Sequence, residues 1–298
     1  MSAVLLLMGA GWGLCIPLTI VAVSTGYQPI GLIFWQVTIV AVLMTGLTWA
    51  RGRRIPFGRT SFTTFLVVAL LGALLPDTIY YAVAPYLDGG VLSIIMASVP
   101  MFAFPIALVL GNDRFAPVRL IGLGCGMFGI LFLLFPDTSL TGLTALAVVP
   151  LALLAPLSYA SEVNYVSKFG TAGMDPIQVL AGASILAMCI SFPAALLSGQ
   201  WINPLPPYGL ADMALVASSA VHAAVYATYV WLTRRAGSVF ASQTAYFVTG
   251  FGILWSILLL QETYSGTVWA ALALMFIGLF LVQPRGSAQI ETDAPARG

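Results

Sequence analysis

The chain has 298 residues, of which 60% are hydrophobic and only 7% carry a charge. Soluble globular chains contain about 25% charged residues, so this composition excludes an ordinary soluble domain and indicates that lipid surrounds most of the protein. The net charge of +1 gives no reason to expect nucleic acid or an acidic partner.

Ten apolar segments follow one another along the chain, separated by short connections that contain Gly, Pro, Asp or Asn. A helix needs roughly 20 apolar residues to cross a bilayer, so the sequence predicts an all-α membrane protein with ten transmembrane helices. The predicted spans are 3–23, 30–50, 62–83, 90–110, 117–136, 143–166, 177–198, 209–232, 238–260 and 267–284. The polar segment 285–298 is predicted to be a disordered cytoplasmic tail.

The basic residues are distributed unevenly between the two sides of this predicted bundle. When the connections are assigned alternately to the two sides, all 11 Lys and Arg residues fall on one side. Basic connections stay in the cytoplasm. We therefore expect an integral protein of the plasma membrane, the bacterial inner membrane, with both termini cytoplasmic.

The chain also contains an internal repeat. Asp113 matches Glu262 and Phe115 matches Tyr264, both at a shift of 149 positions. This shift equals five spans, and an odd number of spans inverts the second copy. We predict a first five-helix repeat over residues 1–140 and an inverted one over 141–284. Inverted repeats are typical of secondary transporters, whose substrate site lies near mid-membrane at the repeat interface.

Several short motifs resemble those of the drug/metabolite transporter superfamily, EamA type. They are Trp12-Gly13 in the first span and the two hairpins Gly-Asn-Asp-Arg-Phe and Gln-Glu-Thr-Tyr, followed by Gly129 and Gly278. The resemblance implies a ten-helix permease for small metabolites, frequently an exporter of amino acids or related compounds. Gln36 stands where family members often carry Arg, so selection of anionic substrates is not expected.

Asp77 is an ionisable residue inside a predicted span, where a charge is costly and commonly functional. It follows Pro76, which removes a helix hydrogen bond. Two interpretations stay open. Asp77 caps a helix that restarts after the proline, or it is a cavity carboxylate that binds a cation or a proton. Tyr80 shares its helical face.

His222, the only histidine, heads a stripe that continues with Tyr226 and Tyr229 at helical spacing. The repeat places this stripe on Asp77 and Tyr80, so we expect both stripes to face a common cavity. A packing role for the lone histidine is the alternative to a titrating one.

The remaining polar candidates lie in other spans. Glu162 lies near Lys168, and we interpret it as a surface ion pair or a carboxylate that reaches toward the membrane surface. A role at the inner gate is the alternative. Uncharged residues, Tyr159 among them, are expected to supply the walls of a pocket with few polar contacts. The predicted substrate-binding residues are Trp12, Gln36, Asp77, Tyr80, His222, Tyr226, Tyr229, Gln243 and Tyr246.

No enzyme motif such as HExxH, GxSxG or a phosphate loop occurs, so we predict no catalytic residue, cofactor or metal. The predicted function is a secondary transporter that exports small amphipathic metabolites such as amino acids by alternating access. It works in the lipid bilayer as a monomer or homodimer, with coupling to protons left open. The alternatives are an uptake carrier or exchanger of the same fold and, from another class, a receptor without transport or a membrane enzyme.

Overall fold

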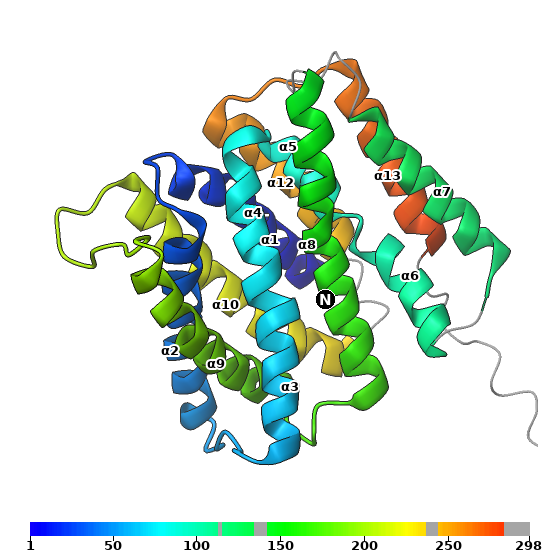
Figure 1. Ribbon diagram of the computed structural model, residues 1–298. Helices are drawn as coiled ribbons and strands as arrows, with labels where there is room; N and C mark the ends of the chain where they lie inside the picture. Colours follow the sequence, from blue (N-terminus) through cyan, green and yellow to red (C-terminus); the bar gives the residue numbers. More distant parts are fainter. Residues whose placement is uncertain (113–114, 134–141, 237–243, 283–298) are drawn as a thin grey trace, which may run out of the picture.

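The computed structural model describes residues 1–112, 115–133, 142–236 and 244–282, in which every secondary-structure element is helical (Figure 1). Within these ranges, 7 helices are long and apolar enough to cross a membrane, and three shorter apolar helices accompany them. The all-helical prediction is confirmed for these residues, and their apolar length suits a membrane protein. Asp113, Gln243 and the predicted tail lie outside the described residues.

The described part before residue 134 contains nine helical elements. They are α1 (Ser2–Val23), α2 (Pro29–Ala50), α3 (Arg59–Ala69), the π-helix η1 (Leu70–Leu74), α4 (Leu75–Val83), the 3-10 helix η2 (Ala84–Tyr86), α5 (Gly89–Met96), α6 (Val99–Leu110) and α7 (Pro117–Phe132). Of these, α3, η1, α4 and η2 form one candidate span and α5 and α6 another. The part after residue 141 forms α8 (Gly142–Phe169), α9 (Pro176–Leu197), α10 (Leu210–Ala236), α12 (Thr244–Leu260) and α13 (Gly266–Val282).

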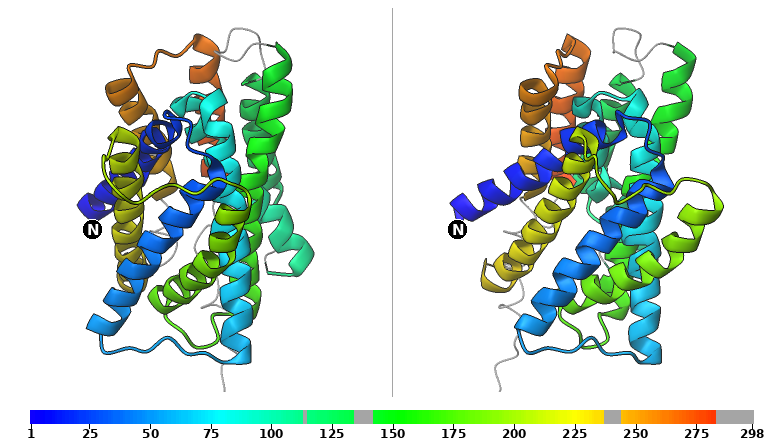
Figure 2. Two further views of the ribbon diagram at one scale, coloured as in Figure 1. Left: turned by 60° about the vertical axis from the view of Figure 1, so that its left-hand side comes forward. Right: turned by 90° about the vertical axis from the view of Figure 1, so that its left-hand side faces the viewer.

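Helices from the two parts of the chain pack against one another. α1 packs on α10 and α12, and α8 packs on α4 and α6. α2 packs along α9 (Figure 2), and α7 lies side by side with α13 at the edge of the bundle (Figure 1). Each part therefore buries its apolar surface largely on the other.

The contact between α7 and α13 depends on glycines. A Cβ atom at Gly122 would lie 2.9 Å from the carbonyl oxygen of Gly278, and one at Gly278 would lie 2.8 Å from the carbonyl oxygen of Gly122. Small residues allow the backbones of membrane helices to approach closely. Gly126 instead makes room for Met101 of α6, whose sulfur would lie 1.8 Å from an added Cβ. The small residues of α7 thus allow close packing against both α13 and α6.

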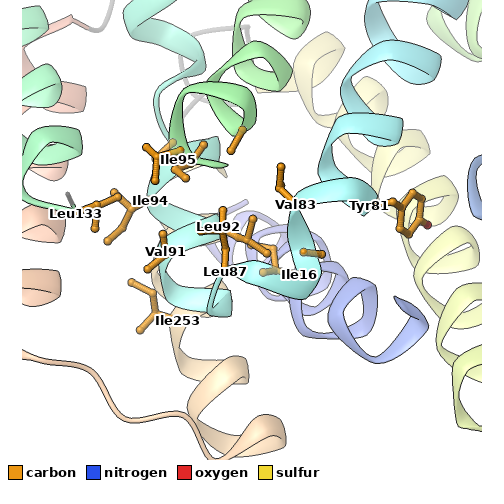
Figure 3. Close-up of a cluster of buried hydrophobic side chains, with 14 of the residues drawn as sticks. Ile16, Tyr81, Val83, Leu87, Val91, Leu92, Ile94, Ile95, Leu133 and Ile253 are labelled. Atoms are coloured by element: carbon orange, nitrogen blue, oxygen red, sulfur yellow. The ribbon is translucent and has the colours of Figure 1, made fainter. Parts of the chain in front are cut away.

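α5 is enclosed at the centre of the bundle. Its residues Val91 and Leu92 are fully buried and pack among Ile16 of α1 and Ile253 of α12 (Figure 3). A helix that is apolar on all faces is expected to be buried on all faces. Tyr81 of α4 borders the same cluster, but its hydroxyl points away from it (Figure 3).

Basic residues gather at one end of the bundle. The Arg51 guanidinium after α2 lies 3.2 Å from the carboxylate of Asp175 before α9. Near the end of α8, the Lys168 ammonium donates to the carbonyl of Leu110 at the end of α6, at 3.1 Å. We call this end of the bundle, lower in Figure 1, the basic end, and the end that carries residues 261–265 the opposite end.

Asp175 begins α9 with a capping box. Its carboxylate accepts from the backbone N–H of Gln178 at 3.1 Å, while the Gln178 side chain accepts from the Asp175 N–H at 2.9 Å. Burial raises the pKa of this carboxyl, but the Gln178 N–H and the Arg51 guanidinium outweigh burial, so the pKa lies below its ordinary value. The cap satisfies N–H groups that a helix start leaves without partners.

Candidate functional site

A cavity of about 240 Å³ lies among α1, α2, α4, α5, α8, α10 and α12. Its lining residues are Trp12, Cys15, Ile16, Thr19, Gln36, Asp77, Tyr80, Tyr81, Met96, Tyr159, Ser218, His222 and Val248. Trp12, Gln36, Asp77, Tyr80 and His222, which the sequence predicted to bind substrate, are all among them. Among the described residues, the lining contains one carboxylate, one imidazole and no Arg or Lys.

The Asp77 carboxylate is the centre of a hydrogen-bonded network in this cavity. The Gln36 amide of α2 donates to one carboxylate oxygen at 2.7 Å, and the Tyr159 hydroxyl of α8 donates to the other. The Tyr81 hydroxyl donates to the Gln36 carbonyl oxygen at 2.5 Å and so fixes the orientation of the amide. Such charge-assisted bonds offset part of the cost of a carboxylate inside a membrane.

The helix does not break and restart at Pro76. A proline lacks the N–H group and its ring would clash with the carbonyl four residues earlier, that of Gly72. The helix widens here into η1, where the Leu75 N–H bonds to the Leu70 carbonyl five residues earlier. No side chain caps α4, so the interpretation of Asp77 as a helix cap is wrong. Single π-turns occur frequently at functional sites.

Two unpaired hydrogen-bond donors lie in the cavity with Asp77. The Trp12 indole N–H and the Tyr80 hydroxyl are buried and have no partner among the described residues. The Trp12 ring lies 6.2 Å from the ring of His222 and 5.5 Å from that of Tyr229. Unpaired buried donors cost free energy, so a ligand with acceptor groups in this cavity would be stabilised by them.

Glycines next to Trp12 hold α1 tightly against α12. A Cβ atom at Gly13 would lie 2.8 Å from the backbone nitrogen of Gly252, and one at Gly9 would lie 2.2 Å from the Cβ of Phe247. At these two positions α1 carries no side chain between its backbone and α12. The Trp-Gly motif of the sequence therefore combines close helix packing with an indole on the cavity wall.

The other predicted site residues are not brought to the cavity wall. Tyr226 and Tyr229 continue the His222 face of α10 toward the basic end, and Tyr229 contacts the site through Trp12. Tyr246 packs against Phe276 of α13, with ring centroids 6.1 Å apart. Gln243 lies outside the described residues.

Several lining residues were not predicted as site residues. Cys15, which the sequence analysis did not single out, donates from its thiol to the carbonyls of Gly11 and Ser218, both at 3.6 Å. Cys15 follows Trp12 by three positions, and Ser218 precedes His222 by four. Helical spacing counted from the predicted residues would have found both.

Glu162 does not form the predicted ion pair with Lys168. Lys168 donates to the Leu110 carbonyl, and the Glu162 side chain turns toward η1. A Cβ atom at Gly72 would lie 3.3 Å from the Glu162 Cγ and 3.4 Å from its Cδ. The structure therefore places this carboxyl group between α8 and η1 instead of at the Lys168 surface.

Comparison with known proteins agrees with this architecture. The chain is 24% identical over 245 residues to the uncharacterized inner membrane transporter YedA of Escherichia coli K12, covering 81% of this chain and 77% of YedA. YedA of the O157:H7 strain gives the same values. A crystal structure with 16% identity and a TM-score of 0.63, covering 94% of this chain and 96% of the other, shows the fold alone.

A family comparison covers nearly the whole chain. The sequence profile of the EamA-like transporter family matches residues 1–135 and 146–283. The apolar helices and the similarity to an inner membrane transporter agree with an integral protein of that membrane. The chain belongs to the EamA-like transporter family.

Proposed function

We propose that the chain is a secondary transporter that exports small amphipathic metabolites, such as amino acids, through the Asp77 cavity. The observation that carries the proposal is that the cavity combines a negatively charged group with free hydrogen-bond donors. The Asp77 carboxylate and the unpaired donors of Trp12 and Tyr80 line the same space. Export is the direction that the family resemblance favours.

A zwitterion matches this pairing of groups. The Asp77 oxygens each accept one protein hydrogen bond, and a carboxylate offers about four acceptor positions, so capacity remains for a substrate ammonium group. The Trp12 N–H and the Tyr80 hydroxyl are available to a substrate carboxylate. A volume of about 240 Å³ is below the ~300–1,000 Å³ typical of drug-sized ligands, which favours a small metabolite.

The same lining disfavours anions. Gln36 takes the place where the family often carries Arg, and its amide is committed to Asp77 and Tyr81. No Arg or Lys side chain is among the lining residues. Zwitterions and cations are therefore expected to bind more tightly than dianions of similar size, and saturable binding of a phosphorylated sugar contradicts this expectation.

Alternating access between two inverted five-helix repeats is the proposed mechanism. The family profile matches two separate ranges of the chain. The helix contacts also follow the predicted repeat, in which α1 corresponds to α8, α4 to α10 and α6 to α12. α1 packs on α10 and α12, and in the same way α8 packs on α4 and α6. Two inverted halves offer two packings of similar energy around one site. The basic end is then the cytoplasmic side, with both termini inside.

Counterflow of a panel of radiolabelled metabolites in proteoliposomes tests the proposal. Asp77→Asn removes the charge that holds an ammonium group, a contribution of about 1.5–3 kcal/mol, so binding should weaken roughly 10- to 150-fold. Trp12→Phe removes one donor and should weaken binding less. Trp269→Phe is the matched control, since Trp269 lies on α13 outside the cavity and is partly exposed.

The outcomes separate function from folding. Protein yield and melting temperature near those of the wild type, with transport lost in Asp77→Asn, support the proposal. Normal transport by Asp77→Asn means that the substrate site lies elsewhere. Accumulation of the same compound in inside-out but not right-side-out vesicles tests the direction.

A further inference from the structure

Glu162 is a partly buried carboxyl group that the Asp77 site does not use. It lies on α8, and its side chain lies over Gly72 of the π-helix η1, where any larger residue would crowd it. Among the described residues the one ion pair joins Arg51 and Asp175, and Lys168 donates elsewhere. Among the described residues, Glu162 therefore has neither a cation to pair with nor a donor for a hydrogen bond.

Its place in the bundle relates Glu162 to the cavity. Tyr159, which donates to Asp77, precedes it by three residues and shares its helical face. Tyr226, one turn beyond His222 toward the basic end, lies within electrostatic range of Glu162. Glu162 thus follows the cavity by about one helical turn in the direction of the basic end.

Among the described residues, few groups on the elements around Glu162 could neutralise it. The described helices α5 and α6 and the π-helix η1, all packed against α8, contain no titratable residue. The titratable or basic groups on the other facing elements are Asp77, Tyr80 and Tyr81 of α4, Arg59 at the exposed start of α3, and Tyr226 of α10. No group of three His, Cys, Asp or Glu side chains that could hold a metal ion occurs in the described residues.

We propose that Glu162 is a second proton-binding site of the transporter, one helical turn from the Asp77 cavity toward the basic end. An unpaired negative charge is costly within a membrane-spanning helix, and binding of one proton turns the carboxylate into a neutral carboxylic acid. The proton comes from water at the basic end and returns to it. Gly72 and the π-helix provide the space for this carboxyl group. The proposal rests on the proposed function, since it assigns the site to a transport path.

Infrared difference spectroscopy of the purified protein in lipid, between mildly alkaline and mildly acidic buffer, tests the proposal. A protonated carboxyl group has a carbonyl stretch that the carboxylate lacks. The wild type should show such a band on acidification. Glu162→Gln should lose this band, whereas Asp77→Asn and the control Asp212→Asn, at the start of α10, should keep it.

Two further variants keep the test decisive. Glu162→Asp keeps a carboxyl group but withdraws it from Gly72, and should shift the band. Gly72→Ala should shift it as well, because the added Cβ lies 3.3 Å from the Glu162 Cγ. Identical spectra for the wild type and Glu162→Gln overturn the proposal. If Glu162→Gln does not fold, Glu162→Asp decides instead, and a band at the wild-type position in that variant overturns the proposal. The spectra need no substrate, so normal transport by Asp77→Asn would overturn the proposed function and leave this assignment standing.

Discussion

The Gln-Glu-Thr-Tyr turn at the opposite end of the bundle caps a helix that lies more than 170 residues earlier in the chain. Both carboxylate oxygens of Glu262 accept from the Gly89 N–H, at 3.1 and 2.9 Å. The Tyr264 hydroxyl donates to Glu262 and accepts from the Gly90 N–H at 2.9 Å. A carboxylate at a helix N-terminus satisfies free N–H groups and the positive end of the helix dipole. Glu262 therefore fastens α5 to the turn between α12 and α13.

Glu262→Gln removes the charge but keeps one oxygen acceptor for the Gly89 N–H. Hydrogen bonds to charged groups contribute about 1.5–3 kcal/mol and neutral ones about 0.5–1.5 kcal/mol. The interaction of a charge with the helix dipole contributes roughly a further 0.3–1 kcal/mol. We expect the free energy of opening the first turn of α5 to be lower by about 1–2 kcal/mol. The open state is then populated about 5- to 30-fold more, and amide exchange from it is faster in proportion.

Hydrogen exchange followed by mass spectrometry measures this opening directly. Amides in the first turn of α5 should exchange faster in Glu262→Gln, while those of α9 should not change. Gln261→Asn is the matched control, because the Gln261 side chain donates to Leu258 at the end of its own helix and has φ +57°, which Asn tolerates. Unchanged exchange in α5 of Glu262→Gln would refute the capping role.

Three other outcomes are expected. Gly122→Ala should destabilise the protein by about 1–3 kcal/mol through overpacking, because its Cβ would lie 2.6 Å from a side chain of α13. Its melting temperature in detergent should therefore fall, whereas that of the control Gly124→Ala should not, since Gly124 faces open space. The lowered pKa of Asp175 means that its stabilisation is present at neutral pH and is lost as the pH falls through that pKa. Asp175→Asn should therefore melt lower at neutral pH and lose less stability in acid. A single cysteine at Ser265 should react with an impermeant reagent outside cells and one at Gly58 should not, and the reverse result would overturn the orientation.

The fold class could be predicted from the sequence because a bilayer imposes strong constraints. Long apolar runs leave the backbone only one way to satisfy its hydrogen bonds within each segment, which is a helix. The effect of Pro76 could not be predicted from the same information. A proline in a helix leads to a break, a kink or a widened turn, and which of these occurs depends on what lies alongside. Here η1 lies against α8, and the Glu162 side chain of α8 occupies the space beside Gly72 of η1.

The cavity could be predicted in part for a related reason. Asp77, His222 and Trp12 were found because polar and aromatic groups inside apolar runs are few and the repeat relates two of the stripes. Their partners depend on contacts between helices far apart in the chain, and one sequence contains no record of these contacts. The bond from Tyr159 to Asp77 spans 82 residues. Glu162 was assigned to the wrong partner because Lys168 is close in sequence, whereas its neighbour in the fold, Gly72, is not.

The network around Asp77 suggests how an event in the cavity acts on the whole bundle. Asp77 of α4 accepts from Gln36 of α2, within the first proposed repeat, and from Tyr159 of α8, in the second. The bond from Tyr159 therefore joins the two proposed repeats. Charge-assisted hydrogen bonds are roughly twice as strong as neutral ones. A proton or an ammonium group that neutralises Asp77 therefore weakens a contact between the repeats as well as filling the cavity. A ligand shifts a conformational equilibrium only by its difference in affinity for the two states, and this contact is a physical source of such a difference.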